Sequence, residues 1–192
     1  TSGGSPESVH RAATLYDDGR ARRVDPFLAF RCMTSAPSVA ISNLLGLRGR
    51  CYSINSACAT GVHNIGHAVE LIRSGAIDRA LAGGAEEVSD LIALAFDALR
   101  LALSSRYNTR PAEACRPFDA ARDGVVMSGG AGILLLEPLD AALDRGAHIR
   151  AEIVGFGANS EGYDLVTPEP EGRHAAACMR QALADARMPA SA

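Results

Sequence analysis

Short apolar segments with the character of strands alternate along this chain with segments that have helical spacing. The helical spacing is clearest over residues 62–72, where apolar side chains recur every three or four positions: Val62, Ile65, Val69 and Ile72. Gly75 is expected to end this helix, and a buried strand is expected next at 80–82, followed by Gly83-Gly84. Strands that alternate with helices predict an α/β fold with largely parallel sheets.

The same rules place the remaining elements. Further helices are predicted over residues 26–34, 38–45, 89–103, 139–145 and 173–187. Further strands are predicted over residues 50–54, 133–137 and 149–156. Residues 104–124 are rich in Arg, Pro and Asp and are expected to form a loop, and residues 1–24 are polar with only weak periodicity, which predicts no definite element.

Composition excludes several classes of function. The formal net charge is −3, so the chain lacks the basic field that attracts nucleic acid. Its longest uninterrupted apolar runs, such as residues 133–136, are far too short to span a bilayer. We therefore expect neither nucleic acid nor a membrane as a partner. Because no charged-then-apolar leader is seen, we expect a cytoplasmic protein.

The five cysteines include no Cys-x-x-Cys pair and no Cys/His cluster, so no metal site is predicted. In a reducing cytoplasm the thiols stay free. Four of them are expected to be small buried hydrophobic side chains: Cys32, Cys51, Cys115 and Cys178.

Cys58 differs because residues 53–61 read as a strand, a tight turn and a helix start, the arrangement that exposes a nucleophile. At that position the helix dipole and unpaired backbone N–H groups favour the thiolate. A buried structural thiol is the alternative interpretation. His63 and His67 lie about 140° and about 180° around the helix from Cys58, so neither reaches the thiol from the same helix.

Three stretches resemble the β-ketoacyl-acyl carrier protein synthase family. They are YSINSACATGVHNIGHAVELIRSG with the AGGAEE that follows it, RPFDAARDG at 116–124, and AHIRAEIVGFGANSEG at 147–162. The likeness runs in the same order along essentially the whole chain. The runs SGGAG and SSRYN resemble the synthase I type more than type II.

This resemblance implies a thiolase-like layered αβαβα fold, incomplete in this chain, and a homodimer. Residues 1–146 would form most of the N-terminal half, without its first strands, and residues 147–192 the start of the C-terminal half. The family's two catalytic histidines and its motif lysine would lie beyond residue 192. The chain is therefore interpreted as an internal fragment that is inactive by itself.

The implied reaction is a decarboxylating Claisen condensation in fatty acid biosynthesis. An acyl group moves from acyl carrier protein to Cys58, and malonyl-carrier then loses CO₂ and attacks the acyl thioester. The acyl groups arrive on the phosphopantetheine of the carrier, so no cofactor is expected on this chain. The Cys58 N–H is expected to donate one hydrogen bond to the thioester oxyanion.

By position, three residues match the family's acyl pocket: Met33, Ile92 and Phe96. Met33 would reach across the dimer, and Ile92 is equally well explained as ordinary core. A basic cluster, Arg20, Arg22 and Arg23, lies where relatives dock the carrier protein, although such clusters are more often solvated surface. Asp119, Arg122 and Asp123 are expected to hold loops together by ion pairs rather than to act chemically.

Three other functions remain open. A polyketide-type ketosynthase has overlapping motifs. A non-catalytic chain-length or dimerisation partner shares the fold, although such a partner has no need of a thiol at Cys58. A cysteine hydrolase that uses His10 or His174 is the least favoured alternative.

Overall fold

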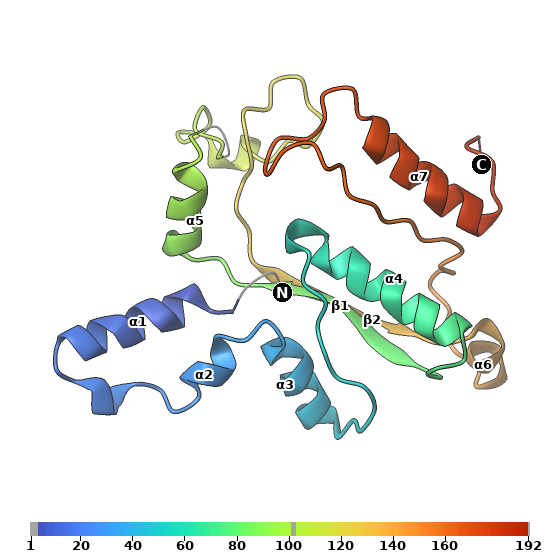
Figure 1. Ribbon diagram of the computed structural model, residues 1–192, viewed down its shortest axis with the longest axis horizontal. Coiled ribbons are helices and arrows are strands. Elements are labelled where there is room, and N and C mark those ends of the chain that lie inside the picture. Colours follow the sequence, from blue (N-terminus) through green and yellow to red (C-terminus); the bar gives the residue numbers. More distant parts are fainter. Residues whose placement is uncertain (1–3, 101–102, 192) are drawn as a thin grey trace. The chain divides into compact units, whose positions relative to one another are not determined.

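The computed structural model describes residues 4–100 and 103–191 (Figure 1). Its helices are α1 (Pro6–Asp17), α2 (Leu28–Arg31), α3 (Ala36–Leu45), α4 (Thr60–Arg73), α5 (Asp90–Asp97), α6 (Leu139–Asp144) and α7 (Arg173–Ala186). Short 3₁₀ turns are η1 (Ala21–Arg23), η2 (Ala57–Ala59) and η3 (Pro111–Glu113), and the strands are β1 (Ala80–Glu86) and β2 (Gly130–Leu136). The described residues form two compact units: unit 1 comprises those up to Gly61 and Gly84–Gly132, and unit 2 comprises Val62–Gly83 and those from Ile133 onward.

Helices α3, α4, α6 and α7 confirm the predicted elements to within a few residues. Glycine follows three of them: Gly46, Gly75 and Gly146 have φ of +63°, +70° and +68°, and Gly75 was the helix end expected from the sequence. This left-handed conformation carries no Cβ penalty at glycine and therefore suits the residue that follows a helix.

Two predicted helices are shorter than expected. The one predicted over 26–34 is a single turn, α2, although the Asp25 carboxylate accepts the Phe27 N–H at 2.8 Å, the kind of bond that a helix N-cap makes. The one predicted over 89–103 ends at Asp97, and Arg100 has φ +62°, which is incompatible with a continuing helix. Residues 101–102 of that prediction lie outside the described residues.

Helix α1 was not predicted, although its start has a clear capping signal. Ser5 is the N-cap, its hydroxyl accepts the Ser8 N–H at 3.2 Å, and Pro6 stands at the first helical position. The weak apolar periodicity of residues 9–15 concealed this signal. None of the twelve residues of α1 is buried, so the helix does not require a regular apolar face.

β1 and β2 lie side by side as a two-stranded sheet (Figure 1). Gly129, before β2, lies against the carbonyl of Glu86 at the end of β1. At the other end, Arg79 pairs with Glu137, their Nε and Oε2 atoms 3.1 Å apart. The pair is thus antiparallel, which corrects the expectation of parallel pairing for these strands, and β1 continues through Gly83-Gly84 instead of ending there.

The predicted strands at 50–54 and 149–156 do not form in the described structure. Over 149–156, side chains rather than a neighbouring strand satisfy backbone groups: Arg73 donates to the Val154 carbonyl at 2.8 Å, and Phe156 N–H donates to Asp185 at 2.9 Å. Arg73 also pairs with Asp185 at 2.7 Å, which joins α4, this segment and α7 within unit 2. A strand requires a hydrogen-bonded neighbour, and local alternation of residues does not supply one.

The described core is small. Its buried hydrophobic residues are Ala68, Val69, Ala82, Tyr107 and Ala142. Large apolar side chains such as Phe118 and Leu165 are fully exposed. Within the ranges that the structure covers, no helix has the length and apolar character needed to cross a membrane.

Candidate active site

Cys58 lies in η2, the 3₁₀ turn directly before α4, and its side chain is exposed. This position confirms the predicted turn and helix start, and in this chain the thiol is exposed rather than buried. The 3₁₀ turn makes one difference, since α4 itself begins two residues later at Thr60. The thiol therefore lies just outside the first turn of the helix.

The turn has an unusual backbone. Ala57, the residue before Cys58, has φ +50°, a left-handed conformation that costs a residue with a Cβ about 1–2 kcal/mol. Two side chains hold the turn from either end: Asn55 Oδ1 accepts the Ala57 N–H at 3.1 Å, and Thr60 Oγ1 accepts the Ser56 N–H at 2.9 Å. Strain of this kind persists only where surrounding contacts enforce it.

One backbone N–H donor of the turn has no hydrogen-bond partner among the described residues. The N–H of Ala59 donates to the Ser56 carbonyl at 3.1 Å, and the N–H of Thr60 donates to the Ala57 carbonyl. With the Ala57 N–H bound to Asn55, only the Cys58 N–H of this run has no partner among the described residues. This N–H is therefore available to donate a hydrogen bond to a group that reacts at the thiol.

Glycine lets β1 approach this turn closely. A Cβ on Gly84 would lie 3.2 Å from the Cα of Gly61, the second residue of α4. A larger residue at position 84 would push the strand and the helix start apart. Gly84 thus has a packing role in unit 1 that strand periodicity alone did not indicate.

The two histidines of α4 make contacts within unit 2. The ring of His63 lies edge-on to Phe156, with centroids 6.2 Å apart at 88°. His67 Nδ1 lies 3.9 Å from Glu70 Oε2, a pair that is ionic only when the imidazole is protonated. That neither histidine serves Cys58 as a base remains a prediction.

The loop at 104–124 is held together by Asp123. Its carboxylate accepts hydrogen bonds from the Ser104 hydroxyl at 2.6 Å and from the N–H groups of Ser105 and Arg106 at 2.9 and 2.7 Å. These bonds, the Ser104 hydroxyl first, lower the pKa of Asp123 to about 2. The predicted locking role is supported, but Asp123 acts through hydrogen bonds rather than through an ion pair.

Two arginines of the loop, Arg110 and Arg116, lie over the ring of Tyr107, which is buried. The guanidinium of Arg116 lies 4.5 Å from the ring centroid, and the Tyr107 hydroxyl donates to the Ala121 carbonyl at 3.0 Å. Arg116 also forms a 3.8 Å ion pair with Asp119, whose carbonyl accepts a hydrogen bond from Arg122 at 2.8 Å. Arg122 therefore contributes a hydrogen bond to the backbone, not the expected ion pair.

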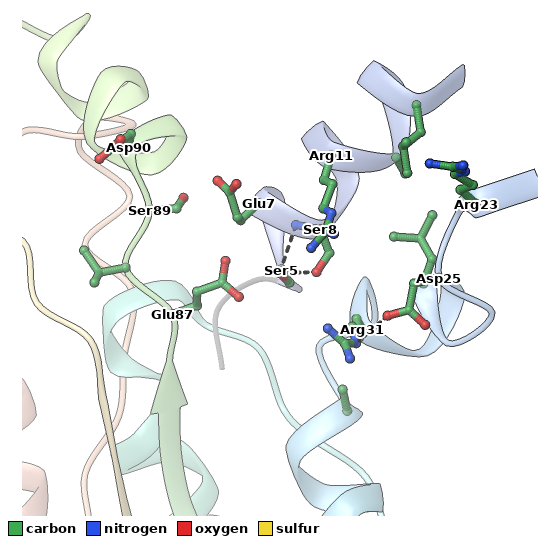
Figure 2. A pocket seen from close by; sticks show the side chains of 15 residues that line it. Ser5, Glu7, Ser8, Arg11, Arg23, Asp25, Arg31, Glu87, Ser89 and Asp90 are labelled. Atoms are coloured by element: carbon green, nitrogen blue, oxygen red, sulfur yellow. Dashed lines mark hydrogen bonds and ion pairs between the residues drawn. The ribbon is translucent and has the colours of Figure 1, made fainter. Parts of the chain in front are cut away.

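Unit 1 also contains a cavity of about 890 Å³ between α1, α2 and the segment Glu87–Asp90. Figure 2 shows carboxylates of Glu7 and Glu87 on one side of it and the guanidinium of Arg11 on another. Its charged lining has both signs, which an acyl chain would not favour. None of the predicted acyl-pocket residues lines it.

Comparison with known proteins identifies the family. The family model described as Beta-ketoacyl synthase, N-terminal domain, matches residues 1–142. The chain belongs to the β-ketoacyl synthase family. It is 45% identical over 190 residues to "3-oxoacyl-[acyl-carrier-protein] synthase 1" of Buchnera aphidicola subsp. Baizongia pistaciae, covering 98% of this chain and 46% of that protein.

Solved structures of ketosynthases confirm the fold. The crystal structure of a β-ketoacyl synthase from Burkholderia phymatum matches with a TM-score of 0.89 and 41% identity, over 100% of this chain and 46% of that one. A ketosynthase bound to a hexaketide, in complex with a type II polyketide synthase acyl carrier protein, matches with a TM-score of 0.86 and 29% identity, over 96% and 46%. The chain thus has part of the thiolase-like α/β fold and spans about half the length of these relatives.

The residues that the β-ketoacyl synthase resemblance assigned to the acyl pocket lie in two elements. Ile92 and Phe96 are four residues apart in α5, hence on one face of the helix, and both are half-buried. Met33 lies in the turn between α2 and α3, with 55% of its surface exposed. The structure thus places Ile92 beside Phe96, while the role of all three as an acyl pocket stays a prediction.

The predicted docking arginines form the turn η1 and its N-cap. Arg20 lies 3.7 Å from Asp18 in an exposed ion pair, whereas Arg22 and Arg23 have no ion pair among the described residues. All three are exposed, which both the docking interpretation and the solvated-surface interpretation allow.

Two other cysteines correct a sequence expectation. Cys51 and Cys115 are exposed, not buried, while Cys32 and Cys178 are half-buried. The Cys178 thiol donates to the Gly157 carbonyl at 3.3 Å, where glycine allows α7 to approach the extended segment. Across the described ranges, no group of three or more potential ligands is arranged to hold a metal ion.

Proposed function

We propose that the protein containing this chain is a 3-oxoacyl-acyl carrier protein synthase and that Cys58 is its acyl acceptor. One observation supports this proposal most directly: in a chain of the β-ketoacyl synthase family, the Cys58 thiol is exposed on a strained turn. The N–H of the same residue has no partner among the described residues. Oxyanion stabilisation needs a backbone donor aimed beside the nucleophile, and this turn supplies both groups.

In the first half-reaction the Cys58 thiolate attacks the carbonyl carbon of an acyl thioester on the carrier. The carbonyl oxygen becomes an oxyanion that accepts the Cys58 N–H. When the tetrahedral intermediate collapses, the bond to the phosphopantetheine sulfur breaks and that thiolate takes a proton. A thiolate suits Cys58 because it is both a good nucleophile and a good leaving group.

In the second half-reaction malonyl-carrier loses CO₂, and the carbanion left on the α-carbon attacks the acyl group on Cys58. The new carbon–carbon bond gives a 3-oxoacyl-carrier and returns the Cys58 thiolate. Since both acyl groups arrive as carrier thioesters, the reaction requires no cofactor bound by this chain. We assign the decarboxylation to residues outside this chain, so that the isolated 192-residue chain catalyses no condensation.

Acyl carrier protein is the proposed partner, docked at Arg20, Arg22 and Arg23. The support is the exposure of η1 and the similarity to a ketosynthase that binds a carrier protein. Exposed arginines attract an acidic carrier mainly by increasing the association rate. We also propose a homodimer, into whose pocket Met33 reaches, and a cytoplasmic location.

Mass spectrometry of the full-length protein tests the assignment of Cys58. After incubation with acyl-carrier alone, the peptide containing Cys58 should gain one acyl group, and malonyl-carrier should then remove it as 3-oxoacyl-carrier. Cys58→Ala is the control. Acylation at another residue, or an unmodified Cys58 in an active enzyme, would contradict the proposal.

A separate assay tests the isolated chain. Condensation of acyl-carrier with malonyl-carrier should not exceed the rate of the Cys58→Ala chain. Turnover above that control would show that the 192 residues contain the decarboxylation machinery.

A polyketide-type ketosynthase is the second candidate, and the similarity to the hexaketide-bound ketosynthase favours it. The 45% identity to a 3-oxoacyl-carrier synthase exceeds the 29% identity to that ketosynthase and favours fatty acid synthesis. The products distinguish the two: one condensation per acyl chain supports the first, whereas repeated condensation without reduction of the keto groups supports the second.

A further inference from the structure

The hydroxyl of Thr60 is a buried group that the proposed chemistry leaves without a role. Thr60 is only 4% exposed, and it is one of the few buried polar residues that the structure describes. Its Oγ1 accepts the Ser56 N–H at 2.9 Å, across the turn that contains Cys58. This hydrogen bond therefore joins the residue two before the nucleophile to the first residue of α4.

Between the two ends of this bond lies the strained residue Ala57, at φ +50°. Left-handed backbone is unfavourable for alanine, so the turn would relax toward ordinary dihedrals without restraint. Asn55 restrains the near side through the Ala57 N–H, and Thr60 restrains the far side through the Ser56 N–H. The direction in which the Cys58 thiol and N–H point depends on these backbone angles.

We propose that Thr60 is a positioning residue: its hydroxyl oxygen keeps the Asn55–Thr60 turn in the conformation that presents the Cys58 thiol and N–H together. The proposal rests on the assigned role of Cys58. Thr60 touches no reacting atom and acts only through the turn.

Because Thr60 is buried, loss of its acceptor oxygen should be costly. A valine at position 60 has nearly the shape of threonine but no acceptor, so it would leave the Ser56 N–H unpaired. Serine retains the acceptor and lacks only the methyl group. The two substitutions separate the hydrogen bond from the packing of the side chain.

The test uses the full-length protein and single-turnover transfer of an acyl group from acyl-carrier to Cys58, well below the melting temperature. Thr60→Val should lower the transfer rate about tenfold, because small displacements of a reacting group have large effects on rate. Thr60→Ser should restore the rate to within about twofold of the natural protein. Thr14→Val is the matched control, since the Thr14 hydroxyl also bonds four residues back, to the His10 carbonyl at 3.1 Å, but on exposed α1.

Each result decides the question. A Thr60→Val transfer rate equal to that of the natural protein overturns the proposal, even if the melting temperature falls. So does a Thr60→Ser rate as low as that of Thr60→Val, which would assign the effect to the methyl group. Thr60→Ala is measured as a second hydroxyl-free variant; if neither folds while Thr60→Ser does, Thr60 acts on folding and the positioning role is also overturned.

The Cys58→Ala control separates this failure from failure of the proposed function. If Cys58→Ala still accepts an acyl group, the assignment of Cys58 is wrong whatever Thr60 does. If Cys58→Ala is inactive and Thr60→Val is unimpaired, only the positioning role is wrong.

Discussion

The turn at Cys58 and the loop at 104–124 both belong to unit 1, and both hold a non-glycine residue in left-handed backbone. In the turn this residue is Ala57, at φ +50°, and in the loop it is Phe118, at φ +63°. Side-chain oxygens accept backbone N–H groups in each: Asn55 and Thr60 in the turn, and Asp123 in the loop. Backbone strain by itself therefore does not distinguish the two regions.

The two regions differ in whether their polar and reactive groups are engaged in contacts. In the loop, Asp123 accepts three hydrogen bonds, and Tyr107 combines burial, a hydroxyl bond and a cation–π contact. In the turn, the Cys58 thiol is exposed and its N–H has no described partner. We infer that strain supports chemistry where reactive groups remain free, and supports loop structure where they are satisfied.

Removing the thiol should have the largest effect on activity. Cys58→Ala should lower condensation by the full-length protein at least about 10³-fold, because no other group takes over covalent catalysis. Its free energy of unfolding should change by less than about 0.5 kcal/mol, since the thiol is exposed. Steady-state condensation and urea unfolding measure the two quantities, and a strongly destabilised Cys58→Ala would mean that the turn depends on its thiol.

Substitution of Asp123 is expected to change stability rather than activity, and the change should depend on pH. The hydrogen bonds lower the pKa of Asp123 from 3.8 to about 2. Since the folded pKa lies below the unfolded one, the ionised carboxylate stabilises the fold above pH 3.8, and this contribution is lost as the pH falls to about 2.

Asp123→Asn should therefore lower the urea midpoint at pH 6 more than at pH 3, compared with the natural chain. Asp119→Asn, in the same loop, is the control. An equal loss at both pH values would show that the charge of Asp123 contributes nothing to stability.

Replacing each strained residue by glycine should distinguish the two regions. Phe118→Gly relieves strain at a side chain that is 98% exposed, and Ala57→Gly relieves the same strain beside Cys58. Both should change the free energy of unfolding by no more than about 1 kcal/mol, because relief of strain opposes the greater flexibility of the unfolded chain.

Only Ala57→Gly should slow acyl transfer, by several-fold, because glycine weakens the restraint on the turn. Single-turnover transfer measures this. An equal reduction by Phe118→Gly would show that the loop also positions reacting groups.

The smallest effect is expected at the Tyr107 ring. Arg116→Gln removes the cation at 4.5 Å and should reduce stability by about 0.5–1 kcal/mol. Arg110→Gln removes a more distant cation, at 5.7 Å, and should have a smaller effect. Urea unfolding of both variants measures the difference, and the reverse order would show that the ion pair of Arg110 with Glu113 outweighs its ring contact.

Local sequence signals predicted much of the helical structure. Helices α4 and α7 follow from apolar spacing and from their flanking Gly and Pro, since these features act within one or two turns of the chain. α1 has an equally local signal in Ser5-Pro6, but its weak apolar pattern does not indicate a helix. The strands at 50–54 and 149–156 were predicted wrongly because pairing depends on a distant segment.

The position of Cys58 could likewise be predicted, but not the contacts that hold its turn. Asn55 and Thr60 lie near Cys58 in sequence, and Asx turns and helix-start hydroxyls are known local patterns. Nothing in the spacing shows that Ala57 takes φ +50° or that Thr60 is buried. The hydrogen bonds of Asp123 to Ser104–Arg106 span 17 to 19 residues and require the folded loop.

The sequence by itself determined where this chain changes from extended segment to turn to helix, and it indicated both Cys58 as the candidate nucleophile and the family to which the chain belongs. Those properties depend on residues next to each other, whose preferences survive in any tertiary context. Only the tertiary structure decided that β1 and β2 pair antiparallel, that Gly84 lies close to Gly61, and that the Cys58 N–H has no partner among the described residues. These depend on which distant groups meet, because a hydrogen bond or a close contact needs both partners in place.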